Sequence, residues 1–221
     1  MTLKLSHLLA FGCAVLMSSG CATKIKTVQL DNPAELRAAT GSLVTVTEPP
    51  SDFIHSQSSK AMLGVIGSIM NIDAGMEIER NGVVSDPSLT VEAKLSEYLS
   101  ANTSLTAGDS LSYKSRKDVP DAPTIQDGYT VDAVTEAWGL NYGALNWNSY
   151  HAIYKGNVRL IDPKGKTVAA THCSYKYPEA LEDQPTYSEL ISGGGILLQK
   201  NLQIVANKCV EKFKADSLSG L

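Results

Sequence analysis

The sequence predicts an α+β fold: a largely antiparallel or mixed sheet of about four to five strands, helices packed on one face, and one disulfide. Two observations indicate this class. Apolar residues recur at helical spacing in residues 86–102 and 186–215, and β-rich runs occupy most of the chain between them. The predicted order is one strand, two helices, about four strands and a helix. Helices on one face of such a sheet form a two-layer arrangement.

The first half of the domain contains one predicted strand and two predicted helices. The β-rich run 43–47 ends at Glu48-Pro49-Pro50, because proline cannot donate to a strand ladder. A helix is expected over 59–80, ended by Asn81-Gly82. A second helix begins after Asp86-Pro87, and four residues line its core-facing side: Val91, Leu95, Tyr98 and Leu99.

The second half contains most of the predicted strands and the last helix. A strand is expected around 110–115, and three longer ones over 129–142, 150–161 and 166–177, the last two joined by a tight turn at 162–165. Thr186 and Glu189 have capping-box spacing and start the final helix. One stripe of this helix should face the sheet: Leu190, Gly194, Leu198, Leu202, Val205, Cys209 and Phe213. We expect Ser192–Gly195 to lie inside the helix and pack closely on the sheet.

The amino terminus has the features of a secretory signal. Lys4 precedes an apolar run of ten residues, 8–17, which is too short to span a bilayer. Small residues 18–20 then lead into Cys21. This segment resembles the lipobox of bacterial lipoproteins, although Ser18 stands where that family prefers leucine. The resemblance implies acylation of Cys21, and Ala22 after the cysteine favours the outer membrane. The alternative is an ordinary secretory signal that leaves Cys21 as a thiol.

The predicted domain organisation follows from this reading. Residues 1–20 are the signal peptide, 21–42 the lipidated amino terminus and tether, 43–215 a single α+β domain, and 216–221 a frayed tail. As a flexible coil, a tether of this length would hold the domain roughly 25 Å from the lipid. Residues 33–39 could instead form one or two helical turns, with Asn32 as the cap.

Two cysteines remain for the folded domain. Cys173 and Cys209 form an even pair in an oxidising compartment, so we expect a disulfide. Cys209 lies on the core-facing stripe of the last helix, which places it near the sheet. A metal site at His172 and Cys173 is disfavoured, because neighbouring strand residues point to opposite faces.

Composition and motifs limit the function. A formal charge of −4 without a long basic run argues against nucleic acid and against electrostatic docking on anionic lipid. His55, His151 and His172 lack zinc-ligand spacing. The sequence contains neither a phosphate-binding loop nor a nucleophile elbow. We therefore expect no cofactor, no metal and no enzyme activity.

Two apolar features of the sequence are candidates for contact with a partner or a ligand. Residues 61–70 are almost uninterrupted apolar residues. They are either buried in the core or exposed for contact with another protein or the membrane. Five aromatic residues form the second feature, either as strand-end core or as a surface for a glycan, a peptidoglycan fragment or a lipid. They are Trp138, Tyr142, Trp147, Tyr150 and Tyr154.

Three features of the chain resemble the periplasmic lipoproteins that share the fold of the TolB amino-terminal domain. They are the order of the elements, the hairpin "YHAIYKGNVRLIDPKGKTVAATHC" and the late helix carrying "NKCVEKF". That group includes auxiliary lipoproteins of ABC-type transport systems. The resemblance implies a non-catalytic structural or assembly component of an envelope complex, anchored in the outer membrane, facing the periplasm and contacting protein partners. The alternative function is a binding module that uses the aromatic set.

Overall fold

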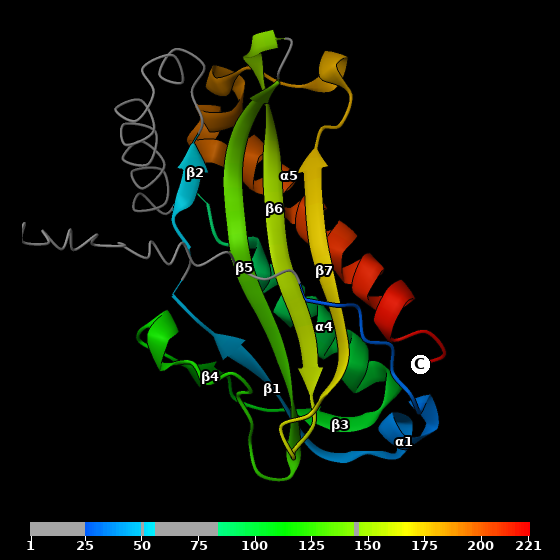
Figure 1. Ribbon diagram of the computed structural model, residues 1–221. Helices are drawn as coiled ribbons and strands as arrows, with labels where there is room; N and C mark the ends of the chain where they lie inside the picture. Colours follow the sequence, from blue (N-terminus) through cyan, green and yellow to red (C-terminus); the bar gives the residue numbers. More distant parts are fainter. Residues whose placement is uncertain (1–24, 50, 56–83, 144–145) are drawn as a thin grey trace, which may run out of the picture.

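The computed structural model describes residues 25–49, 51–55, 84–143 and 146–221. Cys21, the helix expected over 59–80 and its apolar stretch 61–70 lie outside the described residues. Within them, seven strands form one mixed sheet and three α-helices accompany it (Figure 1). The α+β class and the disulfide are therefore confirmed, and the sheet has more strands than predicted.

Three long antiparallel strands form the centre of the sheet. They are β5 (Gly128–Gly143), β6 (Asn146–Ile161) and β7 (Thr167–Tyr177), close to the predicted ranges. The turn between β6 and β7 is also confirmed. The Asp162 carboxylate accepts hydrogen bonds from the backbone N–H groups of Lys164 and Lys166, both at 2.9 Å. An aspartate that binds the backbone two residues on stabilises a turn of this kind.

Short strands extend the sheet on the other side of β5. Strand β1 (Thr40–Thr47) pairs in parallel with β5, with β3 (Ser104–Ala107) and with β4 (Leu111–Ser112), and β2 (Phe53–His55) pairs in parallel with β5. The continuous order is β3-β1-β5-β6-β7. The sequence missed β2 and β3 because segments of three or four residues are too short to show strand periodicity.

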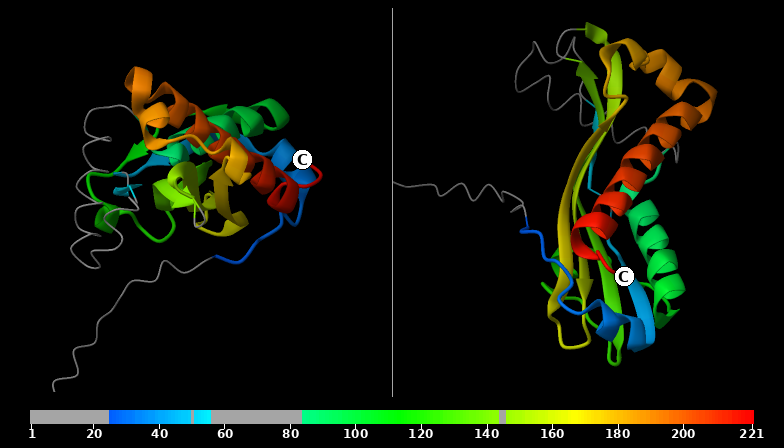
Figure 2. Two further views of the ribbon diagram at one scale, coloured as in Figure 1. Left: turned by 90° about the horizontal axis from the view of Figure 1, so that it is seen from above. Right: turned by 90° about the vertical axis from the view of Figure 1, so that its right-hand side faces the viewer.

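Helices α4 (Pro87–Asn102) and α5 (Tyr187–Ser217) cover one face of the sheet (Figure 2, right). Asp86 caps α4 through Ser88 N–H, and Thr186 and Glu189 form the predicted capping box of α5. The side chains between helices and sheet are fully buried, including Leu95, Leu202 and Phe213. This layer is the hydrophobic core of the domain.

Helix α5 bends near its start, which corrects the expectation for Ser192–Gly195. Gly193, Gly194 and Gly195 have φ angles of 61°, 72° and 74°, and Ser192 is also non-helical. A Cβ atom added at Gly193 or Gly194 would meet nothing within 4 Å. Gly193 and Gly194 therefore do not pack closely on the sheet, whereas Gly195 is buried. They provide a left-handed turn that other residues adopt at a cost.

The expected tether over 21–42 is wrong for residues 25–42. Val28 pairs with Ala170 at the free edge of β7, through hydrogen bonds of 2.9 Å in both directions. Helix α1 (Pro33–Ala38) follows, capped by Asn32, and its Leu36 is 2% exposed. Strand β1 then begins at Thr40. This segment belongs to the folded domain.

The expected frayed tail at 216–221 is also wrong. Helix α5 continues to Ser217, which is fully buried, and Leu218 is 1% exposed. The Arg37 guanidinium of α1 donates to the backbone carbonyls of Gly220 and Leu221. The carboxyl-terminal residues and α1 therefore lie against each other at the lower end of the sheet (Figure 1).

Candidate functional site

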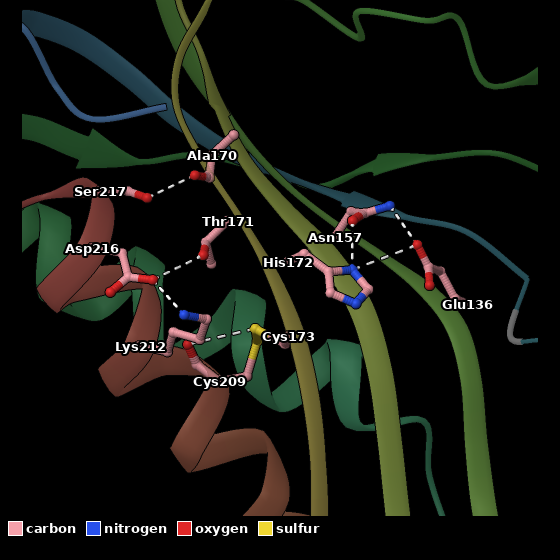
Figure 3. Close-up of a disulfide and its surroundings, with 10 residues drawn as sticks. All are labelled: Glu136, Asn157, Ala170, Thr171, His172, Cys173, Cys209, Lys212, Asp216 and Ser217. Carbon is pink, nitrogen blue, oxygen red and sulfur yellow. Dashed lines mark hydrogen bonds and ion pairs between the residues drawn. A yellow bond between two sulfur atoms is a disulfide. The ribbon is translucent and has the colours of Figure 1, made fainter. Parts of the chain in front are cut away.

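The predicted disulfide joins the sheet to the covering helix (Figure 3). Cys173 of β7 and Cys209 of α5 are bonded, with their Cα atoms 5.4 Å apart and both side chains fully buried. His172 points to the opposite face of the strand, as the alternation of strand side chains predicted. The bond is therefore a structural link inside the core.

Polar contacts continue this link toward the end of α5. Ser217 Oγ donates to the Ala170 carbonyl at 2.7 Å, and Thr171 Oγ1 donates to the Asp216 carboxylate at 3.4 Å. Lys212 forms an ion pair with the same carboxylate. The last turns of α5 are therefore held along β7 by the disulfide and by side-chain hydrogen bonds (Figure 3).

Most of the predicted aromatic surface lies in the core. Trp138 and Tyr154 are 0% exposed and Tyr150 is 6% exposed, whereas Tyr142 is partly buried. Trp147 lies in β6, and its side chain is outside what the structure describes. Trp138 Nε1 donates to the Ser51 carbonyl at 2.6 Å. Trp138, Tyr150 and Tyr154 thus point into the layer between sheet and helices, and are not a stacking surface.

A gap in strand pairing is closed by two polar side chains. Strand β1 pairs with β5 only as far as Val131, and β2 pairs with β5 from Trp138 onward. Between them, Glu92 of α4 accepts a hydrogen bond from Ala133 N–H at 3.3 Å. Arg116 donates to the Thr135 carbonyl at 3.0 Å. These two side chains take the place of a neighbouring strand, since buried backbone groups need partners.

Burial controls the charge of the acids around this gap. Glu92 is 4% exposed, and its desolvation raises its pKa to about 9, with Asp132 and Asp86 adding to the rise. Glu92 is therefore protonated at neutral pH. Burial also raises the pKa of Asp132, and the Arg159 guanidinium opposes this, with Nε at 2.9 Å from the carboxylate. The Asp86 carboxylate accepts from Thr135 Oγ1 at 2.6 Å.

No sequence motif identifies this acidic group. Glu92 is adjacent to the apolar stripe of its helix, and Asp132 opposes Arg159 across β5 and β6. These two positions are the features of the sequence that indicate the group. Because each acid binds a backbone group or a neighbouring side chain, the group supports the sheet. No set of three ligand-type residues among the described ones is placed to hold a metal ion.

The face of the sheet opposite the helices has polar residues at mid-height. Asn157 Nδ2 donates to Glu136 at 2.7 Å, and the His172 ring lies 3.0 Å from Asn157 Oδ1 and 3.7 Å from Glu136 (Figure 3). The described chain starts here, with Ile25 N–H donating to Asn157 Oδ1 at 3.5 Å. We call this side the open face.

Exposed apolar side chains gather where α5 bends. Ile196 is 73% exposed, and Ile191 and Leu197 are about a third exposed, at 37% and 36%. These three residues flank the glycine turn, and we call them the bend surface. An open groove of about 740 Å³ runs beside it, and acidic residues contribute to its lining: Glu182, Asp183 and Glu189.

Comparison with models of known protein families gave no match, and comparison with curated proteins also gave none. Among the described residues, no helix combines the length and the apolar character that crossing a bilayer requires.

Proposed function

We propose that this chain is a lipoprotein held in the bacterial outer membrane through acylated Cys21, with its domain facing the periplasm. There it acts as a non-catalytic structural or assembly component of an envelope or transport complex. The lipobox-like residues before Cys21 support the anchor. The bend surface supports the contact with a protein partner.

The observation that carries the proposal is the exposure of Ile191, Ile196 and Leu197. By contrast, three leucines of the same helix, Leu190, Leu198 and Leu202, are at most 1% exposed. Apolar side chains grouped on a surface are typical of protein contact sites. Because the adjoining groove is partly lined by carboxylates, a complementary partner presents apolar side chains flanked by basic ones.

The buried acids support a non-catalytic role. Glu92 and Asp132 bind a backbone group and a guanidinium, respectively, and both are at most 4% exposed. A general acid or base must come within hydrogen-bond reach of a substrate. Side chains enclosed in this way stabilise the fold instead.

Co-purification tests the partner. A tagged full-length chain is extracted from membranes in mild detergent, and its assembly is measured by size-exclusion chromatography and mass spectrometry. We expect a stoichiometric partner with the unmodified chain, and loss of that partner with Ile196→Asp. Leu89→Asp is the matched control, because Leu89 is 44% exposed on α4, and this variant should retain the partner. A lone monomer from the unmodified chain, or equal loss in both variants, would contradict the proposal.

The anchor has an independent test. Mass spectrometry of the amino-terminal peptide should show a chain that starts at Cys21 and carries acyl groups. Two or three acyl chains are needed for durable attachment, since one binds a bilayer only marginally. A different start, or a free thiol at Cys21, would rule the anchor out.

A further inference from the structure

We propose that the open face of the sheet rests on the phospholipid head groups of the membrane that holds the anchor, with Lys155 and Lys176 against their phosphates. This inference rests on the proposed lipidation of Cys21. It assigns an orientation to the domain and a ligand class, anionic phosphate groups, to a surface outside the core.

The described chain starts on the open face of the sheet. Val28 is hydrogen-bonded to the outer edge of β7, and three residues earlier Ile25 reaches Asn157 of β6. The chain has therefore crossed β7 on the open face by residue 25. The views in Figure 2 place this start on the side of the sheet opposite α4 and α5.

Covalent geometry then limits the distance to the lipid. Four residue steps separate Ile25 from Cys21, and a fully extended chain spans at most about 3.6 Å per residue, or about 14 Å here. This is about half of the distance expected from a flexible tether ending at residue 42. An acylated Cys21 therefore holds the open face, and not the helices, next to the bilayer surface.

The open face also carries exposed lysine side chains. Lys155 pairs with Ser174 in the register of β6 and β7, and Ile153 pairs with Lys176, so both lysines point to the same side as Asn157. Both lysines are exposed, as is Lys26 next to the start of the described chain. The acids near this face already have partners: Glu136 binds Asn157 and lies beside His172. Asp132 is ion-paired with Arg159, and Glu179 with Lys208. The face is locally basic although the whole chain is mildly acidic.

Basic residues close to an anionic lipid surface each contribute about 1 kcal/mol. The net charge of the whole chain disfavours such docking, but charges more than about 10 Å away are largely screened at physiological salt. The local set of lysines therefore determines the interaction once the anchor brings this face to the membrane. This orientation leaves the helix-covered face away from the bilayer.

Amine footprinting tests the orientation. The acylated full-length chain is placed in nanodiscs of phosphatidylethanolamine and phosphatidylglycerol, and lysine acetylation rates are measured by mass spectrometry. The comparison chain carries about 20 Gly/Ser residues inserted between residues 23 and 24, which span roughly 25 Å. We expect Lys155 and Lys176 to react about fivefold more slowly in the natural chain, which corresponds to about 1 kcal/mol each.

Lys94 and Lys200, which are exposed on α4 and α5, are internal controls and should react equally in both chains. Equal rates for Lys155 and Lys176 in the two chains, with acyl groups present on Cys21, would overturn this inference and leave the anchor intact. Slower reaction of Lys94 and Lys200 in the natural chain would also overturn it, since the helices would then face the lipid. A chain without acyl groups would overturn both proposals.

Discussion

The two faces of the sheet differ in what covers them. On one face, α4 and α5 bury a continuous apolar layer that includes Trp138, Tyr154 and Phe213, each 0% exposed. On the other, Asn157, His172 and Glu136 form polar contacts, and lysines are exposed beside them. Fold stability is therefore concentrated on the helix-covered face, and the open face remains available for contact.

Phe213→Ala should cause the largest loss of folding stability. The ring is fully buried between α5 and the sheet, and removing such a side chain costs about 3–5 kcal/mol through lost burial and the remaining cavity. Ile196→Ala on the same helix is the control, and should change stability by less than about 0.5 kcal/mol because Ile196 is exposed. Urea unfolding followed by circular dichroism measures both. Similar losses in the two variants would show that α5 does not form the core.

Removing the disulfide should have the next largest effect. The Cys173–Cys209 bond closes a segment with a sequence separation of 36, and the chain-entropy relation gives about 3–4 kcal/mol of stabilisation. We expect this loss in the Cys173→Ser/Cys209→Ser double variant. Reductant should destabilise the natural chain to a similar extent and leave the double variant unchanged. An effect of reductant on the double variant would mean that another thiol influences stability.

The long elements of both faces could be predicted from the sequence. The apolar pattern shows a period of two in strands β5, β6 and β7, and a period of 3.6 in helices α4 and α5. The disulfide could be predicted from the number of cysteines and from the place of Cys209 on the apolar stripe of the last helix. The helical turns after Asn32 could be predicted, but the positions of residues 25–42 and 216–221 against the rest of the domain could not. Their contacts, such as Val28 with Ala170 and Arg37 with the last carbonyls, join parts of the chain more than 130 residues apart.

The orientation of Trp138 and Tyr142 could not be predicted from strand alternation because β5, which carries both, contains a bulge. The register with β6 shifts between Thr135 and Ala137. An extra residue in one strand reverses the alternation beyond it. Ala133 and Trp138 consequently share the helix-covered face although they are five positions apart. The roles of Glu92 and Arg116 were equally inaccessible, because the gap they fill exists only once β1 and β2 have been placed.

Glu92, the acid at this gap, should make the unfolding free energy depend on pH. The folded chain keeps the Glu92 proton up to a pKa of about 9, whereas the unfolded chain loses it near 4.5. The stabilisation is therefore complete below pH 4.5 and decreases as pH rises toward 9, by at most about 1.4 kcal/mol per pH unit. Glu92→Gln should remove this dependence and be more stable than the natural chain at pH 7.5.

Urea unfolding at pH 5.5 and pH 7.5 measures this effect. The difference in unfolding free energy between the two pH values should be smaller in Glu92→Gln than in the natural chain. Glu97→Gln is the control, because Glu97 is exposed on the same helix and its substitution should leave the pH dependence unchanged. An equal pH dependence in Glu92→Gln and in the natural chain would show that Glu92 is ionised in the folded state.

Asn157→Ala should have the smallest effect, because it changes the open face. The variant loses the hydrogen bond to Glu136 and the contacts of Asn157 Oδ1 with His172 and Ile25 N–H. Together these should cost about 0.5–1.5 kcal/mol. Hydrogen exchange should accelerate at Ile25 and remain unchanged at the backbone amides of Leu202 and Val205 in α5. Ser174→Ala on the same face is the control, since Ser174 is exposed and should change neither measurement. If exchange accelerated in α5 as well, the two faces would unfold together, and the start of the chain would be as essential to the core as the helices are.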